Sequence, residues 1–328
     1  MMKTFQFDND FALGADISWV PQMLESGFVF RNSDGQEQDI LYILKDFGMD
    51  TIRLRTWVNP SDNYKSGHCS AEETLEFALK CKAMGYRLML NYHYGDTWCD
   101  PGKQVPPAAW AHMNIDELVE QLYDYTFETM TMFKEAGIFY EWVQIGNETN
   151  PGMLLPTGST DNWENLTRLY NAGHDAVKAV SPESKTMVHL AEINNTDFCI
   201  DYFEKLENHQ CRYDMMAFSV YPYWVEFHQQ MPYEECLAGF VRSLREIPER
   251  FGKDIMLVET GGVDEKEEES HHLFTDLLEE ISKQPKCKGF LLWEPQGAKV
   301  WSGYPLSAWR SDGTPSDALN ALRFVRKI

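Results

Sequence analysis

Short apolar runs alternate with amphipathic stretches along nearly the whole chain. Eight runs, partly β-branched, have the length of strands and occupy residues 11–18, 51–58, 86–94, 142–148, 185–193, 214–223, 254–260 and 289–294. Helical periodicity separates them over residues 72–84, 115–136, 163–180, 196–206, 233–251 and 268–283. Strands joined by helices of this length form right-handed parallel crossovers, and eight of them close into a barrel. The pattern predicts an α/β protein with the (β/α)8 barrel fold.

An open, doubly wound sheet is the alternative arrangement of the same elements. That fold places its ligand at a switch point, typically beside a glycine-rich phosphate turn. Neither G-x-G-x-x-G nor G-x-x-x-x-G-K-[ST] occurs in the sequence. No low-complexity tract or linker divides the chain, so residues 1–328 are predicted to form a single catalytic barrel domain.

The longest loops follow the third and fourth predicted strands. They span residues 94–110 and 149–162 and are rich in Gly, Pro, Asp and Trp. In a barrel of this kind both loops lie on the face formed by the carboxyl ends of the strands. Barrel enzymes place their chemistry on that face.

Two glutamates stand where an apolar run changes into a loop, Glu148 in Trp-Val-Gln-Ile-Gly-Asn-Glu-Thr and Glu259 in Ile-Met-Leu-Val-Glu-Thr. An ionised carboxylate beside a packed strand loses hydration, so such a position needs compensation or a function. Hydrolysis of a glycosidic bond uses two carboxyl groups, one as acid and one as nucleophile or base. The amide of Asn147 is placed to hold a sugar hydroxyl. The alternative is that both glutamates only meet solvent or an arginine at strand ends.

Further polar residues are expected around the first two strand ends. Asp16 is predicted at the rim after the first strand. Arg53 and Arg55 alternate with apolar residues, so both point into the barrel, where an unpaired guanidinium is too costly. Arg55 lies nearer the loop and is predicted to hold an active-site carboxylate ionised. Arg53 is predicted to form a structural ion pair deeper in the barrel.

The third and fifth strand ends carry histidines and stacking surfaces. His93, Asp96 and Trp98 combine polar groups with an aromatic ring, as sugar sites do. His93 has no second histidine at helical spacing, so a hydrogen-bonded histidine is favoured over a metal ligand. His189 allows the same two interpretations, and a structural role is favoured for it more strongly.

The last strand ends supply the remaining candidates. The Tyr221 phenol is placed to hydrogen-bond the nucleophile carboxylate, and Trp224 to stack on a sugar, although both also suit packing. Trp293 is predicted to support the apolar face of the sugar that is cleaved. Glu294 is a third rim carboxylate and competes with Glu148 and Glu259 for the catalytic roles.

The amino-acid composition limits the classes of partner that the protein is expected to bind. The net charge of −22 disfavours polyanions such as nucleic acid, whereas neutral sugars suit a chain with 10 Trp, 15 Tyr and 19 Phe. The 7 Cys lack metal-ligand spacing, and the acidic run over 264–269 is interpreted as a solvated helix start rather than a calcium loop. We therefore expect no metal, no cofactor and no membrane span, a polysaccharide or oligosaccharide partner, and a monomer. The compartment stays open: cytoplasmic for a full natural chain, secreted or periplasmic for one whose signal was removed.

Several ordered motifs resemble the endo-β-1,4-galactanases of glycoside hydrolase family 53. The longest are Ile-Arg-Leu-Arg-Thr-Trp-Val-Asn-Pro at 52–60 and Val-Gln-Ile-Gly-Asn-Glu-Thr-Asn-Pro-Gly-Met-Leu-Leu-Pro-Thr-Gly at 143–158. Shorter ones lie at 14–18, 96–104, 219–224, 258–260 and 293–295. The resemblance implies a clan A barrel that hydrolyses with retention, with Glu148 as acid/base, Glu259 as nucleophile, and Asn147 and Arg55 as assisting residues.

The chain departs from the family pattern at three places. It has Tyr-Gly-Asp-Thr-Trp-Cys-Asp where the family usually has Tyr-Ser-Asp-x-Trp-Ala-Asp, and Glu-Thr-Gly-Gly in place of Glu-Thr-Ala-Tyr. The segment 296–309 also differs. These positions line sugar subsites in the family and bear on linkage and chain length. Another clan A specificity, for mannan, glucan or terminal β-galactosides, and a non-catalytic sugar-binding barrel remain the alternatives.

Overall fold

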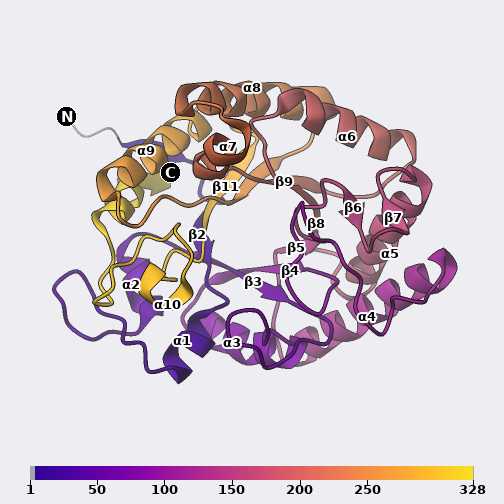
Figure 1. Cartoon of the computed structure of the whole chain (residues 1–328), viewed down its shortest axis with the longest axis horizontal. Helices are drawn as coiled ribbons and strands as arrows, with labels where there is room; N and C mark the ends of the chain where they lie inside the picture. The colour runs from indigo at the N-terminus through magenta and orange to yellow at the C-terminus, as the bar shows by residue number, and fades with distance from the viewer. Residues whose placement is uncertain (1–3, 328) are drawn as a thin grey trace.

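Eight parallel strands close into a barrel in the computed structural model, which describes residues 4–327 (Figure 1). Their order around the barrel is the order of the chain. The strands are β2 (Ala12–Asp16), β3 (Thr51–Thr56), β4 (Arg87–Tyr92), β5 (Trp142–Ile145), β8 (Lys185–Leu190), β9 (Met215–Ser219), β10 (Ile255–Glu259) and β11 (Cys287–Trp293). The predicted (β/α)8 barrel is confirmed.

Long helices form the outer ring and match the predicted ones to within a few residues. They are α3 (Ala71–Ala83), α4 (Ile115–Glu135), α5 (Trp163–Val180), α6 (Thr196–Asn208), α8 (Tyr233–Phe251) and α9 (Glu267–Ile281). Side-chain caps fix several starts: Ser70 with Glu73 and Asn114 with Glu117 form capping boxes, which satisfy otherwise free N–H groups. Each helix covers the sheet with its apolar face (Figure 1).

Successive side chains of each strand point to opposite faces, and this separates two apolar cores. Ile52 and Leu54 of β3 point outward and pack in the large core between sheet and helices. The barrel interior holds a smaller cluster whose members are Ala12, Met89, Trp142, Met187, Met215, Ala217, Met256, Val258 and Leu291. Polar side chains lie beyond this cluster toward the carboxyl ends of the strands. The apolar layer is therefore the floor on which the polar centre rests.

Most strands end a few residues earlier than predicted, and two of these early ends position site residues. The run 142–148 is a strand only to Ile145, because Gly146 (φ 89°) and Glu148 (φ 45°) turn the backbone into the left-handed region. The run 214–223 ends at Ser219, and Pro222 starts the helix α7 (Pro222–Gln229) in its first turn. Both breaks lift side chains off the sheet and onto the mouth of the barrel.

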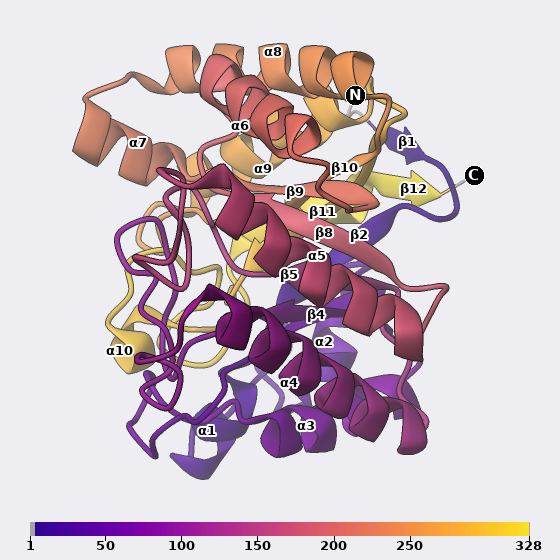
Figure 2. The ribbon, with the colours of Figure 1, turned by 90° about the vertical axis from the view of Figure 1, so that its right-hand side faces the viewer.

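Short elements not predicted from the pattern complete the two ends. The helices α1 (Val20–Glu25), α2 (Ile40–Asp46), α10 (Lys299–Ser302) and η1 (Asp317–Phe324) lie in loops, and two small pairs are β1 (Phe5–Phe7) with β12 (Val325–Lys327) and β6 (Gly152–Met153) with β7 (Gly158–Ser159). Figure 2 shows α7 and α10 at one end and β1 and β12 at the other. The first of these ends is formed by the carboxyl ends of the strands.

Candidate active site

A cleft of about 870 Å³ opens at the carboxyl ends of the strands. Six of the predicted site residues line it together with both glutamates: His93, Trp98, Asn147, Tyr221, Trp224 and Trp293. Pockets of about 300 to 1,000 Å³ bury one small organic ligand, so this cleft suits a short stretch of a sugar chain. The residues lie at or after the ends of five different strands, which only closure of the barrel brings together.

Glu148 follows the strand β5 in a strained turn. Its left-handed backbone (φ 45°) is uncommon for a residue with a side chain, and such strain clusters at functional positions. The side chain is only 9% exposed. Burial and repulsion from Glu259 together raise the pKa of Glu148 to about 8, against a hydrogen bond from Ser219 that lowers it. Glu148 is therefore held protonated at neutral pH.

Glu259 ends the strand β10 in a different electrostatic setting. Arg53 forms an ion pair with its Oε1 at 2.7 Å, and the Tyr221 hydroxyl donates to its Oε2 at 3.1 Å. Burial raises the pKa of Glu259, whereas Arg53 and the Tyr221 hydrogen bond lower it. The predicted contact between the Tyr221 phenol and this carboxylate is confirmed. Of the two glutamates, Glu259 is the one that forms an ion pair with Arg53, and this pair favours its ionised form.

The predicted roles of the two arginines are exchanged in the structure. Arg53, not Arg55, pairs with Glu259, and it also binds Asp16 at 2.8 Å and the side chain of Gln144 at 2.5 Å. The prediction that Arg55 keeps Glu259 ionised is therefore wrong. The physical reason is reach: the long Arg53 side chain rises from deep in the barrel to the rim, which its place in the sequence does not reveal.

Arg55 instead pairs with Glu294 and makes a longer contact of 3.4 Å with Asp16. Its guanidinium carbon lies 4.5 Å from the ring centre of Trp98. Among residues 4–327, two of its buried nitrogens, Nε and Nη2, have no hydrogen-bond acceptor, so the ring face compensates part of the charge. Arg55 thus supports Trp98 from below and does not line the cleft.

Glu294 is fully buried and does not line the cleft. Its carboxylate accepts hydrogen bonds from the Trp19 backbone N–H at 3.0 Å and from Gln296 at 2.5 Å, besides the Arg55 pair. Burial raises its pKa to about 8, and Arg55 opposes that rise. Every strong contact of Glu294 is internal, so its expected competition for the catalytic roles has no support in the geometry.

Two further candidates hold the scaffold instead of facing the cleft. Asp16 is buried between Arg53 and the Ser18 hydroxyl, which donates to it at 2.7 Å. Asp96 accepts from the backbone N–H groups of Asn59 at 3.0 Å and Ala108 at 2.8 Å. Neither lines the cleft, so neither is placed to contact a sugar directly. Asp16 contacts Arg53, and Asp96 ties two loops together.

Asn147 is fixed by contacts on both ends of its amide. The oxygen accepts from Arg53 at 3.0 Å and from Asn91 at 2.9 Å, and the nitrogen donates to the Cys99 carbonyl at 2.8 Å. One of the two N–H hydrogens is used in this way. The other belongs to a group that lines the cleft beside Glu148, as expected for a residue that holds a sugar hydroxyl.

His93 lies at the cleft as a hydrogen-bonded histidine. Its Nδ1 accepts the Cys99 backbone N–H at 3.1 Å, and burial lowers its pKa well below the usual range. Within residues 4–327 no three His, Cys, Asp or Glu side chains are placed to hold a metal ion. His93 therefore presents a neutral imidazole to the cleft.

A histidine and serine pair behind Glu148 was not identified as a functional unit from the sequence. The backbone N–H of Glu148 donates to His189 Nδ1 at 3.2 Å, and His189 Nε2 lies 2.7 Å from the Ser219 hydroxyl. Burial lowers the pKa of His189 well below its usual range, so the ring is neutral. Because Nδ1 accepts the Glu148 backbone N–H, the ring proton is on Nε2. Ser219 then accepts from His189 and donates to the Glu148 carboxylate. The sequence feature that could have identified Ser219 was its place in the predicted strand 214–223, which leads to the mouth of the barrel.

Aromatic rings form a continuous wall of the cleft. Trp293 contacts Trp98 at 5.8 Å, Trp19 at 5.2 Å and Tyr304 at 5.1 Å between ring centres. Trp224 donates from its indole N–H to the Tyr304 hydroxyl at 3.0 Å. Trp19 and Tyr304 were not among the predicted residues. Trp19 directly follows the first predicted strand run, 11–18, and could have been identified from that position, whereas Tyr304 lies in the segment after the last strand.

The acidic run at 264–269 starts a helix, as predicted, but it is only partly solvated. Glu267, Glu268 and Glu269 occupy the first turn of α9, where the helix dipole favours negative charge. Glu267 forms an ion pair with Arg310 at 2.6 Å and so fastens the C-terminal segment to the barrel. Within residues 4–327 no helix has the length and apolarity to span a bilayer.

Comparison with known proteins agrees with this geometry. Residues 12–289 match the profile described as Glycosyl hydrolase family 53. The arabinogalactan endo-β-1,4-galactanase of Humicola insolens is 35% identical over 252 residues, 74% of this chain and 72% of that protein. The endo-β-1,4-galactanase of Bacillus subtilis is 30% identical over 262 residues, 79% of this chain and 58% of that protein.

Solved structures show the same likeness in three dimensions. The family 53 catalytic domain of Ignisphaera aggregans superposes with a TM-score of 0.86 at 29% identity, covering 96% of both chains. A fungal β-1,4-galactanase superposes with a TM-score of 0.84 at 29% identity, covering 95% of this chain and 98% of the other. The barrel, the cleft and the sequence match together show that this chain is a member of glycoside hydrolase family 53.

Proposed function

We propose that this protein hydrolyses β-1,4-galactosidic bonds within galactan or arabinogalactan chains, with retention of configuration. The observation that carries the proposal is the pair of glutamates in one sugar-sized cleft, whose surroundings divide the two roles. Glu148 is kept protonated by burial and by its neighbour, and Glu259 faces the Arg53 guanidinium. Two carboxyl groups with separated proton affinities provide the acid and the nucleophile of a retaining glycosidase.

In the first step Glu259 attacks the anomeric carbon of the sugar. A bond forms between its carboxylate oxygen and that carbon as the glycosidic C–O bond breaks. Glu148 gives its proton to the departing oxygen, so the leaving chain departs as a neutral alcohol. Arg53 and the Tyr221 hydroxyl orient the attacking carboxylate at 2.7 Å and 3.1 Å.

In the second step water replaces the leaving chain. Glu148, now ionised, takes a proton from water, and the water oxygen attacks the anomeric carbon from the side that the leaving chain vacated. The ester bond to Glu259 breaks and its carboxylate is regenerated. Two inversions give net retention, and the Ser219 hydroxyl stabilises the charge on Glu148 between the two steps.

Product analysis tests the proposal directly. Incubated with linear β-1,4-galactan, the purified protein is expected to release reducing ends and to lower the viscosity of the polymer early, as cleavage within chains does. Proton NMR in the first minutes should show the β-anomer of the new reducing end. Hydrolysis of mannan or glucan in place of galactan would favour another clan A specificity, and binding without hydrolysis would favour a non-catalytic barrel.

The pH profile is expected to depend on Ser219. Activity requires Glu148 protonated, so kcat/KM falls as pH rises through the Glu148 pKa of about 8; it requires Glu259 ionised, so it also falls in acid. The Ser219 hydroxyl favours ionised Glu148, so Ser219→Ala should raise that pKa and move the alkaline limb to higher pH. The peak kcat/KM should change less than about tenfold, the scale of one hydrogen bond.

The matched control is Ser184→Ala. Ser184 is equally buried and donates to the Tyr140 carbonyl at 2.6 Å, away from the cleft. When kcat/KM of Ser184→Ala is measured across pH, the alkaline limb should coincide with that of the wild type. An unchanged or lowered limb in Ser219→Ala would show that Ser219 does not act on Glu148.

A further inference from the structure

One end of the cleft is crossed by a contact between two loops that the proposed chemistry does not use. The ammonium of Lys65, in the loop after β3, donates to the backbone carbonyls of Trp301 at 3.0 Å and Ser302 at 2.9 Å, at the end of α10. The Tyr64 ring packs edge-on against Trp301 at 5.0 Å. We call these four residues the clasp. Three of its members line the cleft: Tyr64, Lys65 and Ser302.

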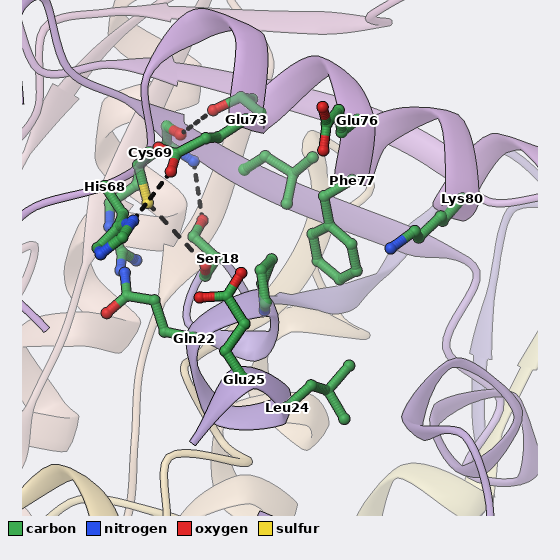
Figure 3. Close-up of a pocket in the computed structure, with 14 residues that line it drawn as sticks. Ser18, Gln22, Leu24, Glu25, His68, Cys69, Glu73, Glu76, Phe77 and Lys80 are labelled. Atoms are coloured by element: carbon green, nitrogen blue, oxygen red, sulfur yellow. Dashed lines mark hydrogen bonds and ion pairs between the residues drawn. The ribbon is translucent and has the colours of Figure 1, made fainter. Parts of the chain in front are cut away.

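The loop that carries Lys65 is held in one conformation. The Lys65 backbone N–H donates to the Gln22 side chain at 2.9 Å, and its carbonyl accepts the Trp19 indole N–H at 3.2 Å. Figure 3 shows the Gln22 side chain reaching from α1 toward His68 and Cys69. Lys65, His68 and Cys69 all have left-handed backbones, with φ of 63°, 61° and 55°. Strain of this kind persists only where the surroundings fix it, so the clasp is a built wall.

A chain of aromatic contacts connects the clasp with the expected platform for the sugar that is cleaved. Trp293 contacts Trp19 at 5.2 Å between ring centres, and Trp19 contacts Trp301 at 5.7 Å. Each step is comparable with the length of one hexopyranose unit in a chain. The clasp therefore lies two aromatic contacts away from Trp293.

The leaving chain lies on the other side of the scissile bond. Glu148 protonates the departing oxygen, so the aglycone extends from Glu148 over the loops after β8 and β9. There the cleft is lined by Glu192, Trp224 and His228, and the Trp224 and His228 rings are stacked 5.8 Å apart. The glycone extends the opposite way, over Trp293 and toward the clasp.

We propose that the clasp ends the glycone side of the cleft two galactosyl units from the scissile bond and thereby sets the length of the preferred product. This inference rests on the proposed function. A chain longer than two units on that side must leave the cleft over Tyr64 and α10, and it loses contact with the enzyme from there on. The Lys65 ammonium has a third N–H, which is placed at the cleft to meet a hydroxyl of the second unit.

The test follows which bond is cut in one substrate. A β-1,4-galactopentaose labelled at its reducing end gives a labelled trisaccharide when two units occupy the glycone side, and a labelled disaccharide when three do. The wild type should form the trisaccharide in roughly tenfold excess, the scale of one charged hydrogen bond. In Lys65→Ala and Tyr64→Ala the ratio should fall toward one. A general loss of activity cancels in this ratio, and Tyr64 is 50% exposed, so its removal does not threaten the fold.

The matched control is Lys299→Ala. Lys299 lies on the same short helix but points to Glu265, with which it pairs at 2.7 Å, and it does not line the cleft. Its product ratio should equal that of the wild type. If the wild type cuts the pentasaccharide but both clasp variants keep its ratio, the clasp does not set product length. If the wild type cuts no galacto-oligosaccharide at all, the proposed function fails and the clasp inference fails with it.

Discussion

Replacing Glu259 with alanine is expected to lower kcat on galactan by roughly 10⁴-fold or more, as loss of a covalent nucleophile does. Glu294 is not placed to substitute, because it is fully buried and bound to Arg55 and Gln296. The fold should persist, since Arg53 keeps its ion pair with Asp16 at 2.8 Å. Steady-state kinetics measure the loss, and thermal unfolding checks the fold.

Rescue of activity by azide distinguishes loss of the nucleophile from a general loss of enzyme function. With an activated aryl β-galactoside, Glu259→Ala and azide should give the α-galactosyl azide, because the small anion attacks directly from the vacated face. Glu294→Ala serves as the matched control and should give no such product. The reverse outcome, with rescue in Glu294→Ala and none in Glu259→Ala, would move the nucleophile to Glu294.

Replacing Glu148 with alanine is expected to produce a loss that depends on the leaving group. Galactan has a poor leaving group that needs a proton, so kcat/KM should fall by roughly 10² to 10⁴-fold, the usual contribution of a general acid. The aryloxide of an activated aryl β-galactoside leaves without protonation, so kcat/KM on that substrate should fall far less. Comparing the two substrates in one variant measures the effect of Glu148 as an acid.

The same variant also lacks the base of the second step. Azide needs no base, so it should raise kcat and give the β-galactosyl azide, the anomer opposite to that from Glu259→Ala. Glu141→Ala, which removes a carboxylate that pairs with Arg87 and does not line the cleft, is the matched control and should show no dependence on the leaving group. Equal losses of Glu148→Ala on galactan and on the aryl galactoside would exclude Glu148 as the general acid.

The barrel could be predicted because each strand is encoded by a short run of neighbouring residues. Residues 51–56 alternate between apolar side chains for the outer core and arginines for the interior, and similar short runs recur seven more times. The ends of β5 and β9 show the limit of this signal. Gly146 and Pro222 fix these ends through backbone geometry, and the apolar pattern continues past Pro222 although the strand does not.

The candidate site was only partly predictable, for a related reason. A carboxylate at the end of an apolar run is costly wherever it points, so Glu148 and Glu259 could be identified from their immediate neighbours. Which arginine meets Glu259 depends on the stagger of β3 against β10 across the barrel. Arg53 and Arg55 have the same local pattern, and their partners come from 206 and 239 positions further along the chain in the folded barrel.

The sequence by itself determined the closed barrel, the end of it that carries chemistry, and the two glutamates at that end, because these follow from alternation and from the cost of burying charge. Only the tertiary structure decided that Arg53 supports Glu259, that His189 and Ser219 stand behind Glu148, and that Lys65 reaches α10 to bound the cleft. Those contacts join loops from different strands, and their distances depend on the stagger of the barrel rather than on any local run of residues.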